Sequence, residues 1–203
     1  MRIITISREF GSGGRELAKR LADYLNFDYY DSEILTAVAN NSGTDENYIE
    51  EMLKNHGWQQ YPITYRSTLT SPIIHTNKIN LLLQQKQVIE EIASLGKDFV
   101  IVGRNADIIL KDYHPFNIFV CATTESKLKR CLERAPKDEN LSEKELLHKM
   151  KQIDKNRSKT REILTNSKWG QKDSYHLTLN TTNWEIKELV DVVGTFANKW
   201  FEK

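Results

Sequence analysis

Short apolar runs alternate along the chain with longer segments of mixed character. The runs at 98–102 and 116–120 are apolar on successive positions, which predicts strands covered on both faces of a sheet. Residues 2–7 predict a short buried strand and residues 27–30 a further strand, and the alternation at 175–180 predicts a fifth at an edge. Strands that alternate with helices indicate an α/β fold with a parallel sheet and right-handed crossovers.

Helices are predicted between these strands. Leu17, Leu21 and Leu25 recur at helical spacing, so residues 14–25 predict an amphipathic helix. Residues 56–72, with glycine, prolines and scattered aromatics, predict an irregular connection. Residues 135–174, with many charges and few large apolar residues, predict a helical hairpin or flap over the surface. The other helices are predicted at 32–41, 45–55, 73–95, from 124 to about 134, and 184–200.

Composition narrows the class of protein. The 29 basic and 28 acidic residues give a formal charge of +1, which does not favour a nucleic acid as partner. Cys121 and Cys131 are too few for a disulfide framework, and no apolar stretch approaches the ~20 residues that span a bilayer. We therefore expect one cytoplasmic domain over residues 1–203, with no membrane partner.

Glycines follow the first strand where the chain turns into the first helix. In such a turn, main-chain N–H groups and the helix amino terminus bind phosphate, and an arginine such as Arg15 adds a charged partner. A tight turn without a ligand is one alternative. A dinucleotide-binding turn, with Asp31 on a ribose, is another, but Arg8, Glu9 and Phe10 intervene before the first glycine. Glu16 also stands where that turn has its third glycine.

Five segments distributed from residue 4 to residue 181 have recognisable patterns: ITISREFGSGGRELAKRLA, YYDSEIL, VIEEIASLGKDFVIVGRNADIIL, DKNR and KWGQKDSYHLTLNT. These segments resemble the cytidylate kinase-like family. The resemblance implies a three-layer α/β/α P-loop kinase fold with a central five-stranded parallel sheet. It also implies a helical insert for the acceptor nucleoside monophosphate at 32–72 and a helical lid at 135–174.

The resemblance implies transfer of the γ-phosphoryl group of ATP, with Mg²⁺, to a nucleoside monophosphate, CMP or dCMP being favoured. However, the loop departs from the standard G-x-x-x-x-G-K-[ST] pattern. Arg8 stands at the first glycine, Gly14 at the lysine and Glu16 at the serine or threonine. Two alternatives therefore stay open: a nucleotide- or phosphate-binding protein with little turnover, and a kinase of another small metabolite. The choice between monomer and homodimer also stays open.

Arginines are expected to carry most of the chemistry, because phosphoryl transfer depends on alignment and charge neutralisation. Arg104 follows a predicted strand end, where ligands bind in open α/β sheets. Arg157 and Arg161 lie one helical turn apart. Structural ion pairs, helix caps and solvated faces are the alternative interpretations of these residues. The predicted donor-nucleotide site consists of Arg8, Gly11, Ser12, Gly13, Gly14, Arg15 and Glu16. The predicted acceptor site consists of Asp31, Ser32, Arg66, Arg104, Asp107 and Asp173. The predicted catalytic residues are Arg15, Arg104, Arg157 and Arg161, and no metal ligands are predicted.

Overall fold

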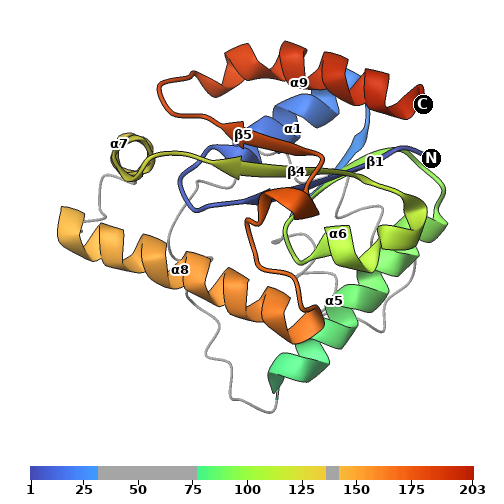
Figure 1. Cartoon of the computed structure of the whole chain (residues 1–203), viewed down its shortest axis with the longest axis horizontal. Helices are drawn as coiled ribbons and strands as arrows, with labels where there is room; N and C mark the ends of the chain where they lie inside the picture. The colour runs from blue at the N-terminus through green and yellow to red at the C-terminus, as the bar shows by residue number, and fades with distance from the viewer. Residues whose placement is uncertain (32–76, 136–141) are drawn as a thin grey trace.

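The computed structural model describes residues 1–31, 77–135 and 142–203, and these form a five-stranded sheet. The strands are all parallel in the order β2-β3-β1-β4-β5, which confirms the predicted parallel α/β fold (Figure 1). β5 lies at an edge, as its alternating pattern predicted. The strand bounds are Ile3–Arg8 (β1), Asp28–Tyr30 (β2), Phe99–Val102 (β3), Phe116–Cys121 (β4) and Leu177–Asn180 (β5).

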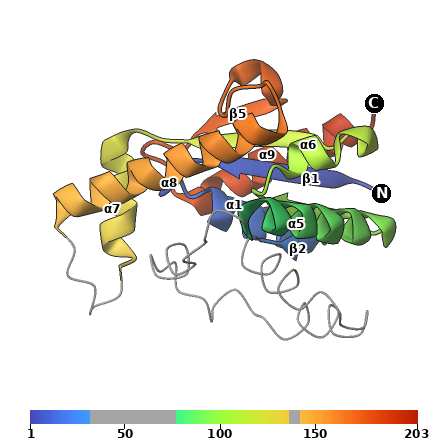
Figure 2. The same cartoon turned by 90° about the horizontal axis from the view of Figure 1, so that it is seen from below.

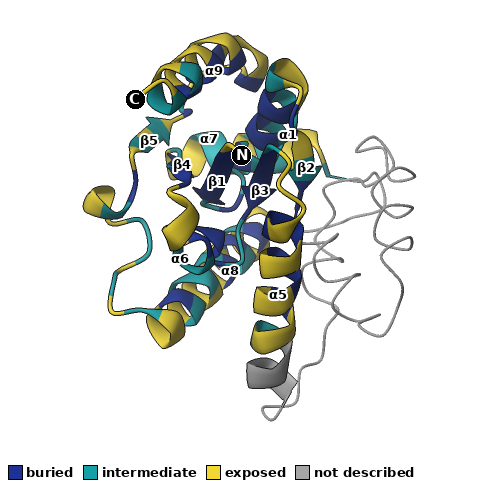
Figure 3. Ribbon diagram, turned by 90° about the vertical axis from the view of Figure 1, so that its right-hand side faces the viewer, coloured by how far each residue is buried: buried dark blue, intermediate teal, exposed yellow. Residues whose placement is uncertain are grey.

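Helices cover both faces of this sheet. α1 (Gly14–Leu25) and α9 (Ile186–Phe201) pack on one face, in a cluster with Ile4, Ile6 and Val102. α5 (Asn77–Ser94) and α6 (Ala106–Ile109) pack on the other, in a cluster with Ile3 and Ile101. Neighbouring residues of β1 thus point into opposite clusters, which is why its apolar run is continuous. Figure 3 shows β1 and β3 buried between the two helical layers.

The segment predicted as a helical hairpin or flap contains one long helix in its described part. α8 (Glu143–Leu164) begins at a capping box formed by Ser142 and Glu145. It lies below the strands in Figure 1 and runs across the front of them in Figure 2. Its buried residues Leu146, Met150 and Ile153 pack with Phe10 in a third cluster. Between α8 and β5 the chain is irregular apart from a short 3₁₀ turn, Lys172–Ser174. The prediction of a flap over the surface was therefore incomplete. It did not foresee that the few apolar side chains of α8 form a separate small core with Phe10.

Two shorter elements complete the described fold. α7 (Thr124–Glu133) begins where the Thr123 side chain accepts a hydrogen bond from the Ser126 N–H, as the predicted strand-to-helix transition requires. A 3₁₀ turn at Lys111–Tyr113 follows α6, and neither it nor α6 was predicted. The helices predicted at 32–41 and 45–55, and the connection at 56–72, lie outside the described residues. No helix in the described ranges has both the length and the apolar character to cross a membrane.

Candidate functional site

The glycine loop joins the carboxyl end of β1 to the amino end of α1. Gly11 and Gly13 have φ angles of 78° and 81°, and Gly13 is the N-cap of α1, where no side chain caps the helix. Ser12 turns inward, since its N–H and its hydroxyl both donate to the Glu9 carbonyl, at 3.3 and 2.8 Å. In the part of the chain that the structure describes, no hydrogen bond uses the N–H groups of Gly11, Gly13 or Gly14. These N–H groups, with the helix amino terminus, are the elements of an anion site.

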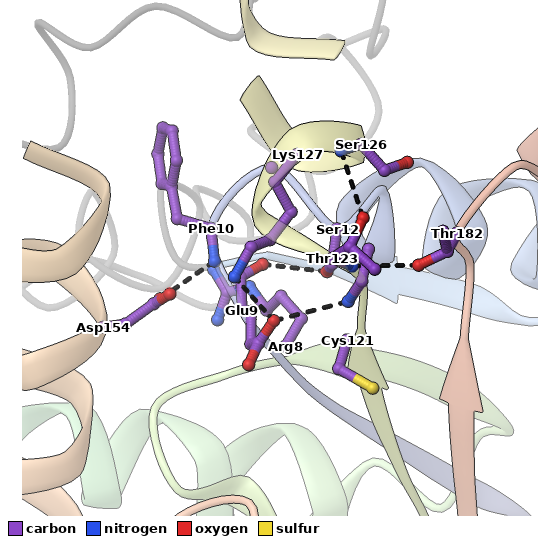
Figure 4. A network of polar contacts seen from close by, with 12 residues as sticks. Arg8, Glu9, Phe10, Ser12, Cys121, Thr123, Ser126, Lys127, Asp154 and Thr182 are labelled. Atoms are coloured by element: carbon purple, nitrogen blue, oxygen red, sulfur yellow. Dashed lines mark hydrogen bonds and ion pairs between the residues drawn. The ribbon is translucent and has the colours of Figure 1, made fainter. Parts of the chain in front are cut away.

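Contacts with α7 and the end of β5 hold the loop in this shape. The Lys127 ammonium donates to Glu9 Oε2 at 2.8 Å, and the same oxygen accepts from the Ala122 N–H at 3.3 Å (Figure 4). On the other side, the Thr181 hydroxyl donates to the Ser12 carbonyl at 2.6 Å. Arg130 donates to the carbonyl oxygens of Gly11 and Thr181, at 3.4 and 2.6 Å. The loop is thus fixed through its carbonyl groups, which leaves N–H groups for a ligand.

Arg8 fills the space between the loop and β3. A Cβ atom added to Gly14 would lie 2.6 Å from Arg8 Cβ, and one added to Gly103 would clash with Arg8 Nη1. The stem of Arg8 therefore packs against the start of α1, and its guanidinium lies against the turn after β3. Gly14 is required here because Arg8 occupies the room that a lysine side chain would need at that position.

Three guanidinium groups gather at the carboxyl ends of the strands. Burial, followed by the charges of Arg157 and Arg104, lowers the pKa of Arg8 to about 9. Burial also lowers the pKa of Arg104, with the charge of Arg157 as the next cause. All three side chains remain protonated at neutral pH, so the cluster stores repulsion between like charges. An anion among them would remove that repulsion and accept bidentate hydrogen bonds.

Arg157 is held in the cluster from α8. Its Nη1 donates to the Arg8 carbonyl at 3.0 Å and to Asp154 Oδ1 at 2.8 Å, and its guanidinium lies 5.9 Å from the centre of the Phe10 ring. Asp154 Oδ1 also accepts from the Phe10 N–H at 2.9 Å (Figure 4). Burial raises the pKa of Asp154, although Arg157 and the Phe10 N–H oppose the rise. One carboxylate therefore ties α8 to both the glycine loop and the arginine cluster.

Two predicted donor-site residues have partners of their own. Arg15 Nη2 lies 2.6 Å from Asp31 Oδ2, and Asp31 is buried at the end of β2. The charge of Asp31 also raises the pKa of Arg8 and of Arg104, so Asp31 faces the cluster. Glu16 points away along α1, where it pairs with Arg20 at 2.8 Å and with Arg134. The loop therefore brings Arg15 toward the site, but it does not bring Glu16.

The other predicted residues divide into three groups. Asp107 and Arg161 form a buried ion pair with each other at 2.6 Å. Asp173 is exposed on the 3₁₀ turn after α8 and makes no hydrogen bond or ion pair within the described ranges, so the structure does not bring it to Arg157. Ser32 and Arg66 lie outside the described residues.

The sequence interpretation missed four residues that shape the site. Asp154 precedes Arg157 by three positions, and this spacing on a predicted helix was a readable signal. Glu9, Lys127 and Arg130 gave no comparable signal, because their contacts join segments far apart in the chain.

Comparison with known proteins identifies the family. The sequence matches the model of the cytidylate kinase-like family over residues 3–183. The chain belongs to this family. An uncharacterised protein from Eubacterium ventriosum ATCC 27560 is similar in structure, with a TM-score of 0.72, 27% identity, and 98% of this chain and 99% of that one covered. A search of curated proteins gave no match.

Two solved kinases confirm the fold that the cytidylate kinase-like family implies. Shikimate kinase from Bacteroides thetaiotaomicron has a TM-score of 0.56 at 13% identity, covering 97% of this chain and 98% of its own. Shikimate kinase from Acinetobacter baumannii, in complex with shikimate, has a TM-score of 0.54 at 14% identity, covering 98% and 94%. The three-layer P-loop kinase fold is thus confirmed, and the family indicates a phosphotransferase.

Proposed function

We propose that the chain transfers the γ-phosphoryl group of ATP to a nucleoside monophosphate, with CMP or dCMP as the favoured acceptor. The observation that carries this proposal is the cluster of Arg8, Arg104 and Arg157 beside the uncapped amino end of α1. Transfer of a phosphoryl group needs donors and positive charge arranged in advance around the transferring group. An arginine cluster next to N–H groups that no carbonyl of the described residues uses supplies both.

Each part of the site has a role in this proposal. The N–H groups of Gly11, Gly13 and Gly14 hold the donor phosphates. Arg104 and Arg157 bind the transferring and acceptor phosphates, and Arg8 supplies the positive charge that the standard loop takes from a lysine at position 14. The Arg15–Asp31 pair borders the acceptor side.

Magnesium enters this proposal only as part of the Mg²⁺–ATP substrate. The described residues do not fit a metal held by the protein: no group of three or more His, Cys, Asp or Glu gathers there, and Glu16 is turned toward Arg20. The Ser12 hydroxyl is used inside the loop. Mg²⁺ is commonly held through substrate phosphates and water, so these residues carry no step for it.

A second candidate is a nucleotide- or phosphate-binding protein of the same fold with little turnover. The observation that favours it is the pair of departures at Gly14 and Glu16, which remove the standard lysine and hydroxyl. A kinase of another small metabolite is a third candidate. In each case we propose one domain over residues 1–203, acting on a small molecule in the cytoplasm as a monomer or homodimer.

A coupled ADP-release assay with Mg²⁺–ATP separates these candidates. The panel contains CMP, dCMP, UMP, AMP, GMP and shikimate, and calorimetric titrations of ATP and CMP run beside it. Turnover with CMP or dCMP that Arg104→Ala abolishes supports the proposal. Binding of ATP without turnover on any acceptor supports the second candidate, and the absence of both binding and turnover would refute both.

A further inference from the structure

A buried ion pair joins α6 to α8, the helix that carries Arg157, and takes no part in the roles assigned above. Arg161 Nη1 lies 2.6 Å from Asp107 Oδ2, and the two side chains are 1% and 2% exposed. Arg161 Nε also donates to the Ser167 hydroxyl at 3.0 Å, and the guanidinium lies 5.4 Å from the centre of the Tyr175 ring. A pair so deeply buried is weak evidence for stability alone, because desolvation opposes the attraction between its charges.

The position of this pair relates it to the cluster. Arg161 lies one helical turn after Arg157 on α8, and Asp107 on α6 lies three residues after Arg104, which stands in the left-handed turn before that helix. The same two segments therefore carry both pairs of residues. Arg104 and Arg157 repel each other, whereas Asp107 and Arg161 form an ion pair.

The backbone near Arg104 also needs an anchor. Arg104 and Asn105 both have left-handed φ angles, 56° and 54°, directly after Gly103 at 77°. Left-handed conformations of such residues persist only where the surrounding structure holds them. The described structure leaves Asp107 Oδ1 buried without a hydrogen-bond partner, so Arg161 is the main support of this carboxylate.

We propose that Asp107 and Arg161 are positioning residues, whose attraction holds Arg104 and Arg157 together at the anion site against their mutual repulsion. Neither side chain contacts the ligand in this arrangement, which replaces the direct contacts that the sequence predicted for them. The inference rests on the proposed function, because it requires a phosphate-bearing ligand at the cluster.

The test is the Asp107→Asn variant, which keeps the shape of the side chain and removes its charge. Asp98→Asn is the matched control, because Asp98 makes an ion pair with Arg2 at 2.7 Å before the same strand, β3, at its amino end. We expect Asp107→Asn to weaken calorimetric binding of Mg²⁺–ATP by about tenfold. Asp98→Asn should lower Tm without changing that affinity.

A double-mutant cycle separates positioning from general stability. If Asp107 acts through the arginines, Arg157→Ala should reduce ATP affinity much less in the Asp107→Asn background than in the wild type. Full additivity would overturn the inference, as would wild-type ATP affinity in Asp107→Asn at a temperature where it is folded. A wild-type protein that binds no ATP would instead refute the proposed function, so the two failures are distinct.

A milder variant covers the case in which Asp107→Asn does not fold. Ser167→Ala removes only the hydroxyl that accepts from Arg161 Nε, while Ser167→Thr keeps a hydroxyl. We expect Ser167→Ala to weaken ATP binding by about threefold and Ser167→Thr to retain most of the affinity. Equal ATP affinity in Ser167→Ala and the wild type would count against the positioning role.

Discussion

The Arg157 guanidinium donates a hydrogen bond to the Arg8 carbonyl oxygen at 3.0 Å, which joins α8 to the last residue of β1. The contact connects α8, which lies outside the sheet, to the point where the chain leaves the sheet for the glycine loop. It also brings a second positive side chain next to that of Arg8, which adds to the effect of burial in lowering the pKa of Arg8. The arginine cluster is therefore assembled by segments that lie far apart in the sequence.

Removing Arg157 should weaken ligand binding more than it weakens folding. We expect Arg157→Ala to raise the Kd for ATP by about tenfold or more, since a hydrogen bond to a charged group contributes roughly 1.5–3 kcal/mol. Isothermal titration calorimetry measures this change. Lys151→Ala, which removes an exposed positive charge from the same helix, should keep the wild-type Kd. Equal losses in the two variants would mean that only net charge matters.

Gly103 should be intolerant of a side chain because of Arg8. Gly103→Ala places a methyl group against the Arg8 guanidinium at a φ angle of 77°. Gly96→Ala is a matched control, because Gly96 has a φ angle of 70° and nothing within 4 Å of the added atom. Both variants carry the backbone penalty, so urea unfolding should show Gly103→Ala to be less stable than Gly96→Ala by about 1–3 kcal/mol. Equal losses of stability would show that Arg8 moves aside freely.

Restoring the standard lysine should fail unless Arg8 is removed. Gly14→Lys forces its Cβ to within 2.6 Å of Arg8 Cβ, so we expect a loss of about 1–3 kcal/mol in the free energy of unfolding. Adding Arg8→Gly, which removes the Arg8 Cβ and restores the first glycine of the standard loop, should recover much of that loss and return a cation to the loop. Urea unfolding of both single variants and the double variant measures the coupling. Additive effects would show that the two side chains do not compete for space.

His176 should make folding stability depend on pH. Its Nδ1 accepts from the Asn117 N–H at 3.0 Å and its ring stacks on Trp200, and burial lowers the pKa of its imidazole. The unfolded chain therefore binds the proton more readily, so this stability is complete above the unfolded pKa of about 6.5 and is lost as the pH falls through the folded pKa.

Thermal melts at about pH 7 and about pH 5 measure this loss. The decrease in Tm should be smaller in His176→Gln than in the wild type. His148→Gln, which changes an exposed histidine on α8, serves as the control and should show the wild-type decrease. An identical decrease in His176→Gln would assign the pH dependence to other groups.

The strands, and which of them are buried on both faces, were predictable because burial is reflected in the local pattern of apolar residues. The runs that became β1, β3 and β4 are apolar on successive positions, as two covered faces require. The predicted bounds of α1 agree with the structure, since glycines precede it and its leucines repeat at helical spacing. α8 was described less well, because its apolar stripe is short and is matched by Phe10, which is remote in sequence.

Only part of the candidate site was predictable. The glycine loop and the position of Arg104 follow from strand ends, which sequence patterns reveal. The alignment on the standard loop showed that glycine replaces the lysine at position 14. It could not show the cause, which is the side chain of Arg8 and its fit against Gly103. The spacing of Arg157 and Arg161 suggested that both lie on one face of the same helix. Arg161 is instead buried in an ion pair with Asp107, a partner that no local sequence pattern indicates.

The small cluster around Phe10 has a mechanical consequence. Phe10 belongs to the glycine loop, but its ring packs among the apolar side chains of α8 and its N–H donates to Asp154 on the same helix. A displacement of α8 would therefore also displace the glycine loop. If α8 moves when a ligand binds, the loop moves with it, and the two parts of the candidate site change shape together.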